Sequence, residues 1–342
     1  MNNRNLREVT IELTSKCNFR CRHCYISDFT NDGLSFDIIE KVLSDARSLG
    51  AYSIVYTGGE VLLRKDFINI IEFTRKKGFS VNILSNGYLL DEDIIQKLSD
   101  LYVNSFGITL FSLDDNINDF ITRSKNSSSK IIGAIELLKK HNIRVEVKTP
   151  VMIYNYSTYK DVKKYCYDND VAFVATSQIT GLNNGSFDNT FLRLESSLGF
   201  EIMKESLPDI YANKSKFDGE DYPCKVIEDS VFIDSKGDVY PCSTFYYSLG
   251  NVKNENLIDI WNSDKIIEIQ NIKNKDLICN TCNIREYCDR CIGLAFMDGD
   301  FRGCSKFDLE FALEKLKYLQ KEEEVNLWKS IANHNISLIH LL

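Results

Sequence analysis

Short apolar runs alternate with amphipathic segments through the first half of the chain. The runs are rich in β-branched and aromatic residues, as is typical of strands, and they lie at 8–14, 51–57, 79–84, 104–110, 143–149 and 171–176. Between them, apolar residues recur at helical spacing and predict helices at 35–49, 66–77, 91–100, 130–141 and 158–168. Gly50 and Gly78 follow the first two helices, and glycine commonly ends a helix in a left-handed conformation.

Six strand–helix units in succession predict a parallel sheet, because short loops and right-handed crossovers join strands of that kind. We therefore predict an α/β fold, a partial (β/α)6 barrel of the TIM type. Functional side chains in such a barrel lie at the C-terminal ends of the strands. Candidate chemistry is accordingly expected in the loops that follow the strands.

The second half of the chain is less regular. A bridging helix is expected at 192–210, with an interruption near Gly199. Residues 231–240 have the alternation and the glycine turn of a β-hairpin. The tail at 305–342 is helical by pattern, and its acidic run at 322–324 is typical of a solvated helix face.

The composition indicates a globular protein, since 44% of the residues are hydrophobic and charges of both signs are mixed. A length of 342 residues suffices for one large and one smaller domain. The formal net charge of −8 provides no basic surface for nucleic acid or anionic membrane, so neither is an expected partner. There is no signal sequence and no apolar run of membrane-spanning length, which predicts a cytoplasmic protein.

Eleven cysteines in a reducing compartment indicate metal binding rather than disulfides. Cys17, Cys21 and Cys24 follow the first strand with intervals of three and two residues. Three thiolates on one cubane [4Fe–4S] cluster leave one iron without a protein ligand, free to bind and reduce a small molecule. The alternatives are a zinc site, for which His23 would have to be the fourth ligand, and three buried small residues.

A second set of seven cysteines lies near the end of the chain, whereas the lone Cys166 is interpreted as a buried small hydrophobe. The seven are Cys224, Cys242, Cys279, Cys282, Cys288, Cys291 and Cys304. Two pairs within this set, 279 with 282 and 288 with 291, also fit a four-thiolate zinc ribbon.

The CxxxCxxC pattern of Cys17, Cys21 and Cys24 resembles that of the radical S-adenosylmethionine (radical SAM) enzymes. The later set resembles the SPASM extension of these enzymes, in the order C-x12-G-x4-C, C-x2-C-x5-C-x2-C and C. The family usually has three residues before Cys291, and this chain has two. The resemblance covers about residues 6 to 305 and implies a radical SAM partial barrel at 1–190, a bridging segment at 191–222, a SPASM domain at 223–305 and a C-terminal helix at 306–342.

The resemblance implies a set of SAM-binding residues at the strand ends, namely His23, Gly58, Gly59, Glu60, Ser85, Thr109 and Arg123. Residues 58–60 match the GGE motif that contacts the SAM amino group, and Ser85 begins a turn similar to the TNG turn. Arg123 would pair with the SAM carboxylate, and His23 would pack near the adenine. Some relatives have an acidic residue where this chain has Phe111, so Asp114 or Asp115 is the nearest substitute.

The resemblance also implies three [4Fe–4S] clusters. Cys17, Cys21 and Cys24 would hold the radical SAM cluster. Cys224, Cys242 and Cys291 would hold the first auxiliary cluster, with one iron open, and Cys279, Cys282, Cys288 and Cys304 the second.

SPASM-type relatives mostly modify peptides. The resemblance therefore implies a peptide maturase, in which a 5′-deoxyadenosyl radical made from SAM removes hydrogen from a peptide residue and a thioether or carbon–carbon crosslink forms. The alternatives are a sulfatase-maturating enzyme that oxidises Cys or Ser to formylglycine, and a radical SAM enzyme acting on a small molecule or tetrapyrrole. Sulfatase-maturating relatives carry an extra cysteine in the interval 225–239, which this chain lacks. A zinc–thiolate binding module does not explain the glycines and Glu60.

The expected partners are a peptide substrate and a one-electron donor such as flavodoxin or ferredoxin. Only sixteen residues precede Cys17, which predicts no fused N-terminal recognition domain. A leader peptide would then be held by a separate protein or by a sheet edge of this chain.

Overall fold

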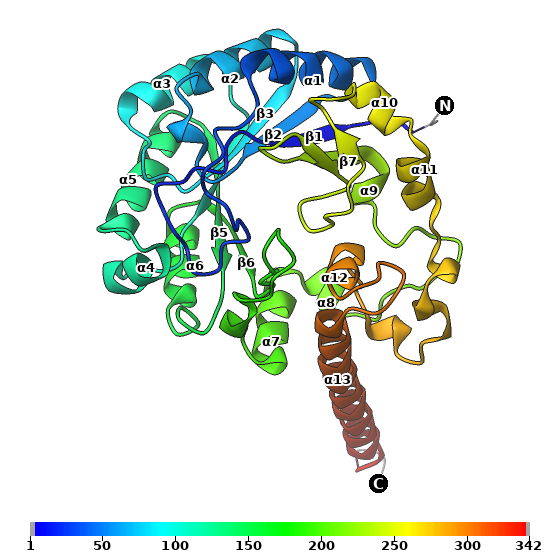
Figure 1. The fold of residues 1–342 in the computed structure, drawn as a ribbon. Coiled ribbons are helices and arrows are strands. Elements are labelled where there is room, and N and C mark those ends of the chain that lie inside the picture. The colour runs from blue at the N-terminus through cyan, green and yellow to red at the C-terminus, as the bar shows by residue number, and fades with distance from the viewer. Residues whose placement is uncertain (1–3, 340–342) are drawn as a thin grey trace.

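The computed structural model describes the backbone of residues 4–339 and the side chains of residues 4–323 (Figure 1). The strands are β1 Glu8–Glu12, β2 Ser53–Thr57, β3 Ser80–Ser85, β4 Ser105–Thr109, β5 Arg144–Pro150, β6 Ala172–Thr176, β7 Ser230–Ile233, β8 Asp238–Tyr240 and β9 Gly250–Asn251. The α-helices are α1 Phe36–Ser48, α2 Phe67–Lys76, α3 Glu92–Asp100, α4 Asp115–Thr122, α5 Ser127–Lys140, α6 Tyr159–Asp168, α7 Ser196–Ser206, α8 Pro208–Tyr211, α9 Val226–Asp229, α10 Leu257–Trp261, α11 Asp264–Asn271, α12 Ile292–Met297 and α13 Lys306–Ile339. Within the described part of the chain, no helix is long and apolar enough to cross a membrane.

Strands β1 to β6 form a curved parallel sheet in sequence order, with helices α1 to α6 on its outer side (Figure 1). The predicted partial barrel is confirmed, and each predicted strand and helix of this half is present within three residues at either end. Because the strands are parallel, the loops after β1 to β4 meet at one edge of the sheet. That edge carries the candidate site.

The core between sheet and helices follows from the two periodicities of the sequence. Alternate residues of β3, such as Val81 and Ile83, are fully buried. On α1 the residues at helical spacing, from Ile39 to Ala46, are buried in the same cluster. The apolar patterns that predict these elements therefore also describe how they pack.

Helix α4 lies between β4 and α5, where the sequence pattern predicts no helix. The Asp114 carboxylate caps it by accepting a hydrogen bond from the Asn116 amide at 2.7 Å. Asp115 accepts hydrogen bonds from the hydroxyls of Ser128, at 2.6 Å, and Ser129, at 2.7 Å, which ties α4 to α5. Both carboxylates named above as substitutes for an acidic residue are thus engaged in local structure.

The predicted hairpin is present as β7 and β8, which pair antiparallel. Strand β7 also pairs parallel with β1 and β8 pairs antiparallel with β9, so the hairpin and β9 extend the barrel sheet to nine strands in the described residues. Ile227 and Trp261, from the second half of the chain, belong to the same hydrophobic cluster as the barrel strands. The cysteine-rich half is therefore joined to the barrel by a shared sheet and a shared core.

The bridging segment departs from its prediction. The helix is broken after Leu207, where Pro208 begins α8, and not near Gly199, which lies inside α7. A Cβ atom at Gly199 would lie 3.0 Å from the Phe311 ring, so glycine here permits α7 to pack against α13. Proline at the first position of a helix is favourable, because its missing N–H has no intrahelical partner there.

A buried lysine fixes α13 to the cysteine-rich region. The Lys315 side chain is 1% exposed, and its Nζ lies 2.7 Å from the Asp289 carboxylate and 2.8 Å from the Ile210 carbonyl. We expect Lys315→Met to lower the free energy of unfolding by about 2 kcal/mol, because it leaves the partly buried Asp289 charge without its partner. Urea denaturation against the exposed control Lys317→Met measures this, and equal stabilities of the two variants would contradict it.

Candidate functional site

The Cys17–Cys24 loop leaves β1 at the C-terminal edge of the sheet and is held on both sides. The amides of Arg20 and Arg22 donate hydrogen bonds to carbonyls at the end of α4, both at 3.0 Å. On the opposite side, the Asn189 side chain donates to the His23 carbonyl at 3.0 Å. The loop is thus fixed in place by the protein on its own.

The three cysteines of this loop are half-buried, and their thiols lie near enough to interact electrostatically. Burial raises the pKa of Cys17 to about 11 and that of Cys24 to about 12. Burial also raises the pKa of Cys21, and repulsion from the other two thiolates adds to the shift. Three half-buried thiols that repel one another when ionised fit a metal centre, because metal binding releases their protons and neutralises the thiolates.

Two buried nitrogen atoms of the loop have no hydrogen-bond partner among the described residues, namely Asn18 Nδ2 and His23 Nδ1. Asn18 Oδ1 accepts from the Asn86 amide at 2.8 Å, which leaves its Nδ2 without a protein acceptor. The His23 ring meets Phe111 edge-on, with ring centroids 5.0 Å apart. Burial lowers the pKa of His23 to about 4, so its ring is neutral at pH 7. Unsatisfied polar atoms beside the thiols fit a bound polar cofactor.

The two glycines after β2 permit a close contact that the sequence did not identify. A Cβ atom at Gly58, where φ is +148°, would lie 2.4 Å from the Thr14 carbonyl oxygen. A Cβ atom at Gly59 would lie 2.3 Å from the Lys16 carbonyl oxygen. Segment 14–16 leads directly into Cys17. The glycines therefore allow the end of β2 to pack against the start of the cysteine loop, and the predicted approach of their backbone to SAM stays a prediction.

Glu60, beside these glycines, is buried and uses both carboxylate oxygens inside the protein. Oε1 accepts from the Ser85 hydroxyl at 2.8 Å and from the Leu62 amide at 3.1 Å, and Oε2 accepts from the Asn86 amide at 2.8 Å. The carboxylate thus connects the ends of β2 and β3, at the turn that Ser85 begins. Direct contact of Glu60 or Ser85 with SAM stays a prediction.

Two further expected SAM contacts lie at the same edge. Arg123 ends α4 in a left-handed conformation with φ of +57°. It lines a pocket of about 280 Å³ together with Cys21 and Cys24. Thr109 is the last residue of β4 and is half-buried. The structure thus brings Arg123 to the thiols, and the roles of both residues stay predictions.

A buried polar cluster of Glu12, Tyr25 and Tyr246 was not found from the sequence. Glu12 is 2% exposed and accepts a hydrogen bond from the Ser235 amide at 2.9 Å. The Tyr25 hydroxyl lies 3.4 Å from the Glu12 carboxylate, and the Tyr246 hydroxyl is buried without a partner among the described residues. A glutamate that ends an apolar strand is a weak signal by itself, because its partners lie far away in the chain.

Glu12 gives a prediction on pH. Burial, more than any other cause, raises its pKa in the folded state. The unfolded protein therefore loses this proton at lower pH than the folded protein, and the free energy of unfolding falls as pH rises between the two pKa values. Gln does not ionise, so we expect Glu12→Gln to be more stable than the natural chain at pH 8 by about 1 kcal/mol, and equally stable near pH 4. Urea denaturation at both pH values measures this, and a difference independent of pH would contradict it.

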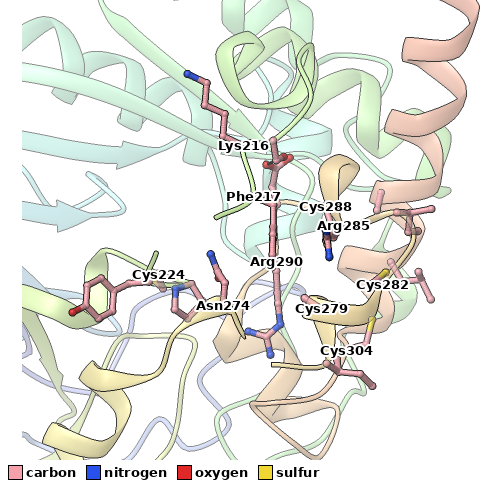
Figure 2. A pocket seen from close by; sticks show the side chains of 18 of the residues that line it. Lys216, Phe217, Cys224, Asn274, Cys279, Cys282, Arg285, Cys288, Arg290 and Cys304 are labelled. Carbon is pink, nitrogen blue, oxygen red and sulfur yellow. Dashed lines mark hydrogen bonds between the residues drawn. The ribbon is translucent and has the colours of Figure 1, made fainter. Parts of the chain in front are cut away.

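The second cysteine set surrounds a cavity of about 740 Å³ (Figure 2). Five thiols line it, those of Cys224, Cys279, Cys282, Cys288 and Cys304. All eleven cysteines, none of which falls outside the described residues, are unpaired, and Cys166 is fully buried in the core as expected.

Electrostatic interactions divide the seven thiols into two groups. Burial raises the pKa of Cys304, and repulsion from the thiolates of Cys279 and Cys282 adds to the rise. Burial also raises the pKa of Cys288, followed by repulsion from Asp308 and then from the thiolates of Cys279 and Cys304. In the same way, Cys242 faces Cys224, and Cys291 faces Cys242. In the zinc-ribbon alternative, Cys291 would join Cys279, Cys282 and Cys288 at one site. The cavity is instead lined by these three cysteines together with Cys304, and Cys291 is not among its lining residues.

Two family models match the chain. Residues 11–166 match the radical SAM superfamily, and residues 224–283 match the iron–sulfur cluster-binding domain SPASM. The first match covers β1 to β5 and the Cys17–Cys24 loop, and the second covers the hairpin and the first four cysteines of the later set.

Among curated relatives, a tungsten-containing aldehyde ferredoxin oxidoreductase cofactor-modifying protein of Pyrococcus furiosus is 24% identical, over 83% of this chain and 89% of that protein. The antilisterial bacteriocin subtilosin biosynthesis protein AlbA of Bacillus subtilis is also 24% identical, over 83% of this chain and 66% of AlbA. Among solved structures, Streptococcus suis SuiB bound to its precursor peptide SuiA superimposes with a TM-score of 0.71 at 15% identity, covering 89% of this chain and 76% of SuiB. This likeness shows a common fold.

Proposed function

Because the chain belongs to the radical SAM superfamily and carries a SPASM iron–sulfur domain, we propose that it is a peptide maturase that installs an intramolecular crosslink. The observation that carries this proposal is the pairing of two thiol sites on one continuous sheet. Three half-buried thiols lie at the C-terminal edge of the barrel, and seven more follow in the region joined to it through β7. The first set suits radical formation, and the second suits electron transfer.

When bound, the cluster and SAM supply one-electron cleavage of SAM to methionine and a 5′-deoxyadenosyl radical, which removes a hydrogen atom from the target. The thiols of Cys17, Cys21 and Cys24 hold the cluster. Arg123, which lines the pocket beside Cys21 and Cys24, pairs with the SAM carboxylate. His23 packs near the adenine as a neutral ring, and Thr109 and the backbone at 58–60 border the same space.

The later cysteines hold two auxiliary clusters in this proposal. Cys224, Cys242 and Cys291 bind the first, and Cys279, Cys282, Cys288 and Cys304 bind the second. The grouping of thiols by their mutual repulsion supports this division. A chain with all three sites loaded contains about twelve irons.

The likeness to AlbA, a bacteriocin biosynthesis protein, and to SuiB, which binds a precursor peptide, supports a peptide substrate. Closing a thioether or carbon–carbon bond removes two hydrogens from the peptide, one as an atom and the other as a proton with one electron. The auxiliary sites suit acceptance of that electron. The likeness to the Pyrococcus cofactor-modifying protein keeps a small-molecule substrate as the second candidate.

Two partners complete the proposal. A one-electron donor of the flavodoxin or ferredoxin type reduces the radical SAM site. A leader peptide binds to a separate recognition protein or adds to an edge strand, and β6 and β9 are the edges of the described sheet. The division of the chain at residues 190, 222 and 305 belongs to the same proposal.

Co-expression of the chain with a small cysteine-containing peptide from its own genomic neighbourhood tests the substrate. The expected product is two hydrogens lighter than the peptide for each crosslink, and tandem mass spectra lack fragments within the linked segment. A Cys17→Ala chain is the matched control and leaves the peptide unchanged. Formylglycine in the peptide would favour the sulfatase-maturating alternative, and an unmodified peptide with active SAM cleavage would favour a small molecule.

A further inference from the structure

Arg290 extends into the cavity lined by five cysteines (Figure 2). It lies between Cys288 and Cys291 in the chain, so its backbone is part of a cysteine-bearing loop. Its Nε and Nη2 atoms donate hydrogen bonds to the Gly303 carbonyl at 3.3 and 2.8 Å, and Nη2 also donates to the Phe301 carbonyl. Three hydrogen bonds to one backbone segment fix the plane of the guanidinium.

The remaining terminal nitrogen of this guanidinium, Nη1, is buried and has no hydrogen-bond partner among the described residues. A buried donor on a charged group is costly to leave unsatisfied, by about 1–3 kcal/mol or more. Since the other nitrogens are held by the backbone, Nη1 cannot reach solvent by a simple rotation. Because Arg290 lines the cavity, a ligand bound there can supply the acceptor that this nitrogen lacks.

The charge of Arg290 is also unpaired within the described part of the chain. The neighbouring Asp289 carboxylate lies 2.7 Å from Lys315 Nζ and is neutralised by it. The buried Asp308 carboxylate accepts from the Cys291 amide at 2.7 Å and forms no ion pair with Arg290. Arg290, Cys279 and Cys304 line the same cavity (Figure 2). The guanidinium therefore lies near cysteine residues and forms no ion pair with a carboxylate of the described residues, although its charge acts on Asp308 from a distance.

We propose that Arg290 is a positioning residue that donates a hydrogen bond from Nη1 to a sulfur of the iron–sulfur cluster held by Cys279, Cys282, Cys288 and Cys304. This inference rests on the ligand assignment proposed above. One-electron reduction adds one negative charge to the cluster, and the fixed positive charge stabilises that state. Hydrogen bonds to sulfur and local charge both set the reduction potential of such clusters. Arg290 therefore raises the reduction potential of this cluster.

Arg285 provides a matched control from the same cavity. Its guanidinium lies 4.7 Å from the Phe217 ring, and its Nη1 donates to the Asn280 carbonyl at 2.5 Å. It therefore has the same charge and the same cavity, but its Nη1 has a protein acceptor. If charge anywhere in the cavity were enough, the two arginines would have equal effects.

The test uses the full chain with the Cys17, Cys21 and Cys24 thiols replaced by alanine, so that only the later cysteines bind iron. Arg290→Gln, Arg290→Lys and Arg285→Gln are made in this background, reconstituted anaerobically, and titrated with dithionite while cluster reduction is followed by electron paramagnetic resonance. We expect Arg290→Gln to lower the equilibrium constant for reduction of one cluster about tenfold, equivalent to about 59 mV. Arg290→Lys retains the charge and should fall between Gln and the parent, and Arg285→Gln should match the parent.

Iron content separates structural from electrostatic effects. If Arg290→Gln loses iron because segment 301–304 is released, Arg290→Lys is compared with the parent instead. The reduction potential of its cluster must then lie below that of the parent. Equal potentials for all iron-loaded variants overturn the inference and leave the proposed function intact. A parent chain that binds no iron at these cysteines instead overturns the proposed ligand assignment.

Discussion

Replacing Cys17, Cys21 or Cys24 by alanine is expected to abolish formation of 5′-deoxyadenosine from SAM. Each thiol lies half-buried in a loop that hydrogen bonds hold on both sides, so we expect no neighbouring side chain to take its place. The three substitutions together should remove about four of about twelve irons and leave the auxiliary sites loaded. Anaerobic reconstitution with dithionite and SAM, followed by chromatography of the products, measures the loss.

Cys166→Ala is the matched control for these variants. Cys166 is a cysteine buried in the core on α6, outside both thiol sets. Its removal should cost about 1 kcal/mol of stability through the small cavity that it leaves, with full SAM cleavage. Retention of SAM cleavage by Cys21→Ala, or its loss in Cys166→Ala at unchanged fold, would contradict the assignment.

The second large effect is expected for Gly59→Ala. Its Cβ atom would lie 2.3 Å from the Lys16 carbonyl oxygen and 2.4 Å from the Ser15 carbonyl oxygen, both of them backbone atoms next to Cys17. The loop must shift to relieve the contact, which should cost about 3 kcal/mol of stability and displace the first thiol. We expect SAM cleavage to fall to the level of the Cys17→Ala chain.

Gly133→Ala separates this contact from the general effect of replacing glycine. Gly133 lies inside α5, and a Cβ atom there meets nothing within 4 Å. Alanine favours a helix interior over glycine, so this variant should gain about 0.5–1 kcal/mol with unchanged activity. Equal stability of the Gly59→Ala and Gly133→Ala chains would show that the close approach of β2 to the cysteine loop is not required.

The sequence was sufficient for the features that depend on local pattern. The barrel strands are rich in β-branched residues, and the helices between them each have an apolar face. The pattern of hydrophobic residues therefore identified both kinds of element. The spacing of Cys17, Cys21 and Cys24 directly after β1 indicated where chemistry lies, because parallel strands present their C-terminal ends together. The GGE motif at residues 58–60 was identified by its resemblance to that of the radical SAM enzymes.

Features that depend on contacts between distant segments were missed. The Gly58 and Gly59 positions need glycine because of carbonyls at residues 14–16, which no local pattern reveals. Glu12 accepts a hydrogen bond from the amide of Ser235, which is 223 residues away in the sequence. Strand β7 has only four residues, and its sequence gave no sign that it pairs with β1. Helix α4 is stabilised by polar capping from Asp114 rather than by an apolar face of recognisable length.

The central claim is that this chain uses iron–sulfur clusters on its two thiol sets to cleave SAM. The most direct test is anaerobic reconstitution of the full chain, with iron and sulfide counted and 5′-deoxyadenosine measured after addition of dithionite and SAM. The account predicts about twelve irons per chain and 5′-deoxyadenosine that depends on Cys17, Cys21 and Cys24. Tightly bound zinc in place of iron, or a fully iron-loaded chain that leaves SAM intact, would contradict it.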